Sequence, residues 1–275
     1  MTRTYTPWFL LVVALALAAV YLFPLYWMYV TSLKTGSEIF ANPPTFWPNS
    51  PNPGVYPEVW ARRTMPTFLM NSVLIAGGVT AITVILGTGC AYVLARYRNV
   101  WIDIGLFCVL MLQVLPASVM VTPLFVGFNQ IGLLNYPRTA VVLAAAAKAM
   151  PFFVVLVRAT FMSVPRELEE AALVDGNSRV GAFFSIVLPL ARNGILVCAI
   201  LTFMSSFGEY IYSKSIIQSP LLQPASVGLS GFLGPNSTDW SSIMAYSAIY
   251  VTPILLAFVI LQRRIVSGLT SGALK

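Results

Sequence analysis

Residues 163–178 read Ser-Val-Pro-Arg-Glu-Leu-Glu-Glu-Ala-Ala-Leu-Val-Asp-Gly-Asn-Ser, a polar segment between apolar stretches at 139–161 and 194–216. The connection between those stretches is about 30 residues long, which exceeds an ordinary link between helices. Pro165 near its start, glutamates in its early turns and Gly176 near its end predict a short helix with defined ends. A second short helix is predicted over residues 178–188.

The chain around this segment has the composition of a membrane protein. Of its residues 58% are hydrophobic and only 9% are charged, and the mean hydropathy is +0.81, whereas about a quarter of the residues in soluble proteins are charged. Apolar stretches of the length that spans hydrocarbon recur along the chain. We therefore predict an all-α, polytopic membrane protein with six transmembrane helices, at residues 8–31, 71–95, 101–125, 139–161, 194–216 and 241–261.

The basic residues predict the orientation of these helices. An even number of crossings places both termini on one side, and cytoplasmic segments carry an excess of Lys and Arg. Segments on the side of the termini hold ten of the sixteen basic residues: Arg3, Arg96, Arg98, Arg158, Arg166, Arg179, Arg192, Arg263, Arg264 and Lys275. The other side holds Lys34, Arg62, Arg63, Arg138 and Lys214, and Lys148 lies within a crossing. Both termini are therefore expected in the cytoplasm, with lipid as a partner and nucleic acid excluded because the charges are scattered.

The sequence lacks the usual catalytic patterns. No lysine follows a glycine, so the common phosphate-binding loop is absent, and the chain has no histidine. The cysteines Cys90, Cys108 and Cys198 lie within apolar stretches and are interpreted as packing residues. We expect no enzyme activity, no metal and no cofactor in this chain, so any energy source must come from outside it.

Two further segments are interpreted structurally. Gly87, Ala91 and Ala95 repeat at four-residue spacing, which predicts a face that another helix can approach closely. The loop over residues 32–70 is rich in proline and aromatic residues and is expected to be an ordered excursion without regular helix. It serves either as a docking surface or as a spacer, and the sequence does not decide between them.

The polar segment also resembles the EAA loop of binding-protein-dependent ABC importer permeases. In that family the loop is a cytoplasmic coupling helix that sits in a cleft of a separate ATPase subunit. The resemblance implies that Glu170 contacts the ATPase, that Ala171 and Ala172 pack closely against it, and that Gly176 forms the turn. An ordinary amphipathic surface helix is the alternative interpretation. The matching residues are Glu170, Ala171, Ala172, Asp175, Gly176, Phe183, Ile186, Leu188 and Pro189, whereas Asn177 and Asn193 depart from the common pattern.

The wider chain resembles the second, short permease of the maltose-type carbohydrate branch. The resemblance implies a type I ABC importer permease fold, a heterodimer with a second permease, two copies of an ATPase subunit that binds ATP and Mg, and an extracytoplasmic solute-binding protein. Glycerol-phosphate compounds or another polar solute, and a secondary transporter, are the alternatives. The matching residues are Ser32 to Lys34, Asn71, Ser72, Ala91, Tyr92, Ala95, Arg96, Pro123 to Phe125, and residues 268–275.

The same comparison divides the chain into three parts. Residues 1–66 are expected to hold the first helix and an extracytoplasmic loop. Residues 67–262 form the transmembrane core, with the coupling loop at 163–193, and residues 263–275 form a cytoplasmic tail. The expected location is the cytoplasmic membrane.

Polar residues within the crossings are candidates for the solute pathway. Glu209 is a carboxylate in an apolar stretch, where charge is costly unless it faces a cavity or a partner. Glu209 is expected either to accept hydrogen bonds from solute hydroxyls, with Phe207 or Tyr210 stacking on the sugar ring, or to form a buried ion pair or hydrogen bond. Lys148 serves the pore or pairs structurally, and a salt bridge to Glu209 is one hypothesis. Gln113 is a further candidate.

Overall fold

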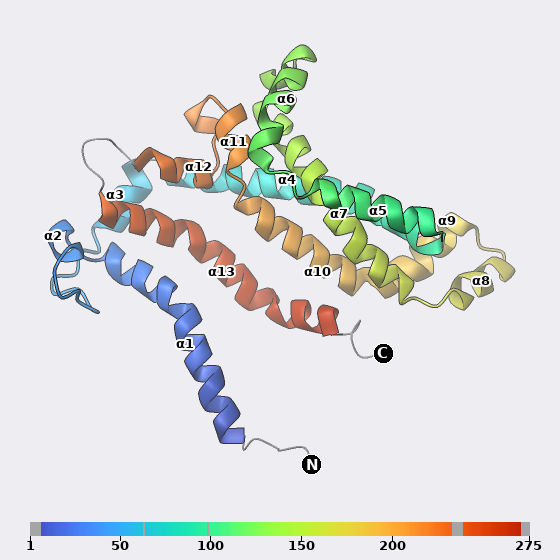
Figure 1. Ribbon diagram of the computed structural model, residues 1–275, viewed down its shortest axis with the longest axis horizontal. Helices are drawn as coiled ribbons and strands as arrows, with labels where there is room; N and C mark the ends of the chain where they lie inside the picture. The colour runs from blue at the N-terminus through green and yellow to red at the C-terminus, as the bar shows by residue number, and fades with distance from the viewer. Residues whose placement is uncertain (1–6, 63, 98, 233–238, 271–275) are drawn as a thin grey trace. The chain divides into compact units, whose positions relative to one another are not determined.

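The computed structural model describes residues 7–62, 64–97, 99–232 and 239–270, and all regular elements in these ranges are helical (Figure 1). Five continuous helices are long and apolar enough to cross a membrane, and a bent pair can supply a sixth crossing. The predicted all-α polytopic architecture is thus confirmed. Arg3, Arg63, Arg98 and residues 271–275 lie outside the described residues. The five are α1 (Pro7–Ser32), α4 (Met65–Arg96), α7 (Pro137–Met162), the run Arg179–Phe207 and α13 (Trp240–Thr270).

The predicted crossing at 101–125 is not one continuous helix, because the chain bends within it. Helix α5 (Val100–Leu112) and helix α6 (Ala117–Gln130) meet at an angle of 94°. Pro116 stands at the start of α6 with φ −60°. Proline has no amide hydrogen to donate, and it disfavours helical geometry in the residue before it, so a helix ends ahead of it.

The predicted crossing at 194–216 is shifted, and the predicted separate helix at 178–188 is wrong. Helices α9 (Arg179–Ala182) and α10 (Leu188–Phe207) form one run through the π-helical turn η2 (Phe183–Val187). The Leu188 amide bonds the Phe183 carbonyl five residues back. This wider turn accommodates Pro189, whose ring would clash with a carbonyl in an ordinary helix. The run ends before Gly208, and α11 (Ile211–Ile216) is a separate helix.

The described chain forms two compact units, the first comprising Met1–Met65 with Gly228–Pro253. In this unit the loop after α1 is not free of helix as predicted, because it contains α2 (Gly36–Ile39) and α3 (Val55–Arg62). Val55 and Val59 of α3 are buried one helical turn apart, so burial of an apolar face accounts for this helix. Lys34 is also buried, donating to the Thr45 carbonyl, with its ammonium 4.5 Å from the centre of the Trp27 ring.

The second unit comprises Pro66–Val227 with Ile254–Lys275. Ala91 and Ala95 of α4 are buried in a cluster with Phe153 and Val157 of α7. A Cβ atom added at Gly87 would lie 2.6 Å from Phe153 Cδ1, so a larger residue there would force the Phe153 ring to shift. The small residues of α4 therefore serve close helix packing, as the sequence predicted.

Candidate functional site

Helix α8 (Glu167–Val174) is the helix predicted within the polar segment. Glu167, Glu169 and Glu170 occupy its first turn, where negative charge complements the helix dipole. At its end the Asn177 amide bonds the Ala172 carbonyl (2.9 Å), and the Gly176 amide bonds the Leu173 carbonyl (3.1 Å). These two bonds form a Schellman motif, which requires the left-handed φ of +88° seen at Gly176. Gly176 is thus the turn that the resemblance implied.

The predicted contact residues of α8 differ in exposure. Glu170, Ala171, Asp175 and Gly176 are exposed, whereas Ala172 is 5% exposed and packs within its own chain. Ala172 therefore packs α8 against its own chain, and Ala171 is the alanine available to another molecule. A hollow of about 510 Å³ adjoins this face, lined by Leu168, Ala171, Ala172, Asp175, Gly176, Asn177 and Ile186.

The second half of the predicted motif turns inward. Phe183 packs against Tyr92 of α4, with ring centroids 4.6 Å apart, and Val187 is fully buried. Leu188 is half-buried and Pro189 is exposed at the start of α10. Phe183 and Val187 therefore pack this segment against the transmembrane helices, whereas Pro189 lies on the surface and Ile186 lines the hollow beside α8.

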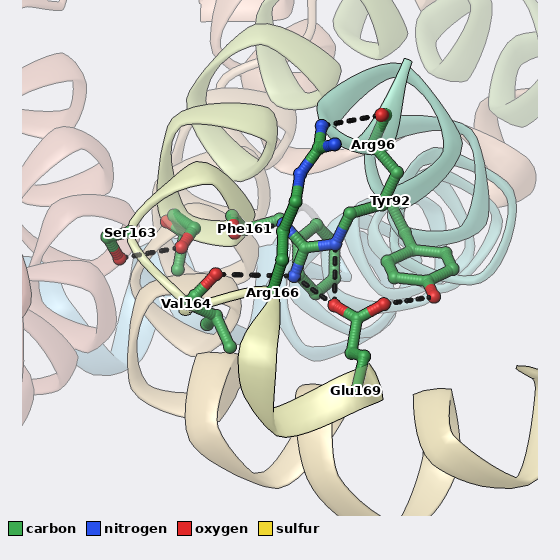
Figure 2. A network of polar contacts seen from close by, with 8 residues as sticks. Tyr92, Arg96, Phe161, Ser163, Val164, Arg166 and Glu169 are labelled. Atoms are coloured by element: carbon green, nitrogen blue, oxygen red, sulfur yellow. Dashed lines mark hydrogen bonds and ion pairs between the residues drawn. The ribbon is translucent and has the colours of Figure 1, made fainter. Parts of the chain in front are cut away.

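A polar cluster that the sequence did not predict joins α8 to α4 and α7 (Figure 2). The Glu169 carboxylate forms an ion pair with Arg96 and accepts hydrogen bonds from Arg96 Nε at 2.5 Å and from Tyr92 Oη at 2.8 Å. Arg96 also donates to the carbonyls of Phe161 (2.9 Å) and Val164 (3.4 Å). The signal available beforehand was the four-residue spacing of Tyr92 and Arg96, which places both on one helix face.

A second feature of the same unit is a cavity of about 590 Å³. It brings together four of the predicted pathway residues, Gln113, Lys148, Glu209 and Tyr210. Gln113 lies at the break between α5 and α6, and its Nε2 donates to the Lys148 carbonyl at 2.6 Å. Phe207 is 4% exposed and does not line the cavity, so it is not placed to stack on a solute there.

Glu209 is held by the helix that follows it. Its carboxylate accepts hydrogen bonds from the Tyr212 amide (2.7 Å), the Ser213 amide (2.9 Å) and the Ser213 hydroxyl. The first-turn amides of a helix lack partners within the helix, so Glu209 caps α11. The spacing of Glu209 from Tyr212 and Ser213, three and four residues, was the available signal for this cap.

The hypothesised salt bridge between Lys148 and Glu209 is not formed in the described part of the chain. Both residues line the cavity, but the Glu209 oxygens face the amides of α11. Lys148 is exposed, and among the described residues its ammonium has neither an ion pair nor a hydrogen bond. The cavity wall therefore carries two charged groups. The Glu209 carboxylate is hydrogen-bonded within the protein, whereas the Lys148 ammonium has no hydrogen-bond or ion-pair partner among the described residues.

Comparison with known proteins places the chain among transport proteins. Residues 84–271 match the family described as binding-protein-dependent transport system inner membrane component. The chain is 33% identical to the sulfoquinovosyl glycerol transport system permease protein SmoH of Agrobacterium fabrum, over 92% of this chain and 89% of that protein. It is 30% identical to the trehalose/maltose transport system permease protein MalG of Thermococcus litoralis, over 97% and 96% of the two chains.

The fold also occurs among solved structures. One of these is a crystal structure of a bacterial ABC transporter involved in the import of the acidic polysaccharide alginate. One of its chains matches 95% of this chain and 99% of its own length, with a TM-score of 0.77 and 20% identity.

Proposed function

Because this chain belongs to the family of inner membrane components of binding-protein-dependent transport systems, we propose that it forms half of the membrane pore of an ATP-driven importer for a sugar or oligosaccharide. The family implies an ATPase subunit and a solute-binding protein as partners, and a location in the cytoplasmic membrane. The observation that carries the proposal is α8, a capped helix with an exposed carboxylate and a small residue beside it.

Coupling to the ATPase runs through the exposed face of α8. Glu170 offers a carboxylate that orients a basic or amide group of the partner, and Ala171 permits close approach. The hollow bounded by Asp175, Gly176 and Ile186 accepts a side chain from the ATPase. ATP and Mg bind to that partner, and this chain has no ATPase site of its own.

The subunit arrangement completes the proposal. A second permease pairs with this chain, two ATPase copies bind to the coupling helices, and both termini lie in the cytoplasm. Residues 1–66, 67–262 and 263–275 are the proposed divisions of the chain. ATP binding favours one of the two access states by interacting more strongly with it, which is the only way a ligand can shift such an equilibrium.

The solute class is supported by the relatives and by the cavity. SmoH and MalG are named for sugar-containing solutes, and the cavity presents Gln113, Tyr210 and Lys148. These side chains donate hydrogen bonds that suit sugar hydroxyls. Glu209 positions α11 at the cavity wall and contributes little free charge to the solute.

A solute with an anionic group is the second candidate, and the open charge of Lys148 favours it. An ammonium within a membrane segment is costly without a partner, and a sulfonate, phosphate or carboxylate on the solute would supply one. A glycerol-phosphate compound belongs to this class, as does an acidic sugar. A secondary transporter would instead run on an ion gradient and would need no ATPase.

Purification of the intact importer with its binding protein tests the proposal. Mass spectrometry of the solute released from the binding protein is expected to show a sugar, either neutral or acidic. Glu170→Lys is expected to release the ATPase from the membrane complex, whereas Glu167→Gln, one turn earlier on the same helix, retains it. Transport that persists without the ATPase and stops when the ion gradient collapses would refute the proposal.

A further inference from the structure

Helix α8 packs on α9 and η2, and side chains at its first turn reach α4. Ala172 is its buried residue, whereas Leu168, Leu173 and Val174 are 42%, 40% and 87% exposed. Burial of apolar surface therefore does little to fix this helix in place. A coupling helix must nevertheless transmit force, so its attachment has to resist displacement.

The polar cluster supplies that attachment. Glu169 stands in the first turn of α8, and its two carboxylate oxygens receive Arg96 and Tyr92, which lie one turn apart on α4. The Arg96 and Glu169 side chains are each 13% exposed. Charge-assisted hydrogen bonds are stronger than neutral ones, and partial burial limits their screening by salt.

Further bonds bring α7 and η2 into the same cluster. Arg96 donates to the carbonyls of Phe161, in the last turn of α7, and of Val164, just beyond it. Arg166, which precedes α8, donates back to the Arg96 carbonyl at 2.6 Å. The Tyr92 ring lies edge-on to Phe161, with centroids 5.6 Å apart, and contacts Phe183 of η2. Figure 2 shows the Arg96 guanidinium beside Phe161, Val164 and Glu169, with Tyr92 at the other oxygen of Glu169 and Arg166 at the Arg96 carbonyl.

We propose that Tyr92, Arg96 and Glu169 form a clamp that makes α8 move as one rigid body with the adjoining ends of α4 and α7. The inference rests on the proposed function, in which an ATPase pulls on α8. Two neighbouring glutamates then have separate roles, because Glu170 faces outward to the ATPase, whereas Glu169 faces inward and passes the movement to the membrane helices. Without the clamp, α8 no longer moves with α4, so transport stops, the binding protein no longer stimulates the ATPase, and only basal ATP hydrolysis continues.

A distance measurement within the whole importer tests this directly. Spin labels are placed at Val93 of α4 and Val174 of α8, both exposed, with Cys90, Cys108 and Cys198 replaced by alanine. Pulsed electron double resonance is recorded in nanodiscs without nucleotide and with ATP and vanadate. The distance between the labels is expected to be the same in both states. Glu169→Gln is expected to broaden the distribution of this distance or to make the distance differ between the two nucleotide states. The matched control Glu167→Gln is expected to leave the distance unchanged.

Exchanging the charges of Arg96 and Glu169 tests whether the ion pair transmits movement or only supports folding. Arg96→Glu and Glu169→Arg are each expected to reduce ATP hydrolysis stimulated by the binding protein about tenfold, and the double variant to recover most of it. The ATPase subunit stays bound in all three. A parent distance that changes with ATP, or a Glu169→Gln distance identical to the parent, would overturn the clamp. The docking proposal fails separately, if Glu170→Lys leaves the ATPase bound.

Discussion

The clamp and the cavity lie in the same compact unit, but they treat their charges in opposite ways. At the clamp, Arg96 and Glu169 form an ion pair, and two neighbouring carbonyls accept further hydrogen bonds from Arg96. At the cavity, Glu209 is satisfied by the amides of α11, whereas Lys148 has no anionic partner in the described ranges. Charges that are paired within the protein hold helices to one another. A charge without a protein partner is available to a solute.

Arg96→Ala is expected to have the largest effect on stability. It leaves Glu169 partly buried without its cation and removes the link among α4, α7 and α8. Removing one partner of a buried pair costs about 3–5 kcal/mol, and the slight exposure of this pair lowers the expected loss to about 2–4 kcal/mol. Thermal unfolding of the purified complex measures it. A melting temperature equal to that of the parent would show that the cluster contributes no stability.

Glu209→Ala is expected to have the next largest effect on stability, because it removes the cap of α11. Two first-turn amides and one hydroxyl lose their acceptor, and loss of a helix cap costs about 1–2 kcal/mol. The hydrogen-exchange rate of α11 should rise, while the exchange of α8 stays at the parent level. Ser213→Ala is the milder control, because it removes only the hydroxyl donor. Unaltered exchange in α11 would contradict the capping role.

Lys148→Met is expected to affect transport without destabilising the protein. Methionine keeps an unbranched side chain but carries no charge, so no desolvated ammonium remains. For a solute that contacts Lys148, uptake below saturation should fall about tenfold, which equals about 1.4 kcal/mol of binding. Uptake into proteoliposomes, with unfolding measured in parallel, tests this prediction. A marked loss of stability would show instead that Lys148 has a structural partner in the assembled importer.

Asp103→Asn is expected to have the smallest effect. Asp103 pairs with Arg158 at 2.7 Å, but the Asp103 side chain is 62% exposed, whereas the clamp residues are nearly buried. Exposed pairs contribute about 0–1 kcal/mol, and Arg158 keeps its bond to the Leu94 carbonyl. Unfolding and stimulated ATP hydrolysis should both stay near the parent values. A loss as large as that of Arg96→Ala would mean that exposure does not distinguish the two pairs.

Much of the fold was predictable because a membrane imposes simple rules on the chain. Apolar length located the crossings, and the small residues at Gly87, Ala91 and Ala95 marked a packing face. Three of the differences from the predicted boundaries involve proline or glycine. Pro116 broke a predicted helix, whereas Pro189 was absorbed by a π-helical turn and Gly208 ended α10 early. Whether a proline breaks a helix or is accommodated depends on hydrogen bonds that local pattern does not reveal.

The candidate sites were predictable in part. Spacing within a single helix identified α8 and its glycine turn, since those depend on neighbouring residues. The clamp joins Tyr92 and Arg96 to Glu169, which is 77 and 73 residues away from them. No local pattern reports contacts over such separations. The pairing of Lys148 with Glu209 was wrong for the same reason: opposite charge indicated it, but the amides of α11 had already taken the carboxylate.

The sequence by itself determined that this chain crosses the membrane, that a short capped helix interrupts the crossings, and which permease family it resembles. These properties depend on composition, local spacing and backbone preferences, which act over a few residues. Only the tertiary structure decided which charged side chains have partners within the protein and which do not. It also decided that Ala172 is buried while Ala171 is exposed. Burial and long-range hydrogen bonding arise only when distant segments pack. The interaction energy of a charged group depends on those surroundings, so it cannot be inferred from local sequence.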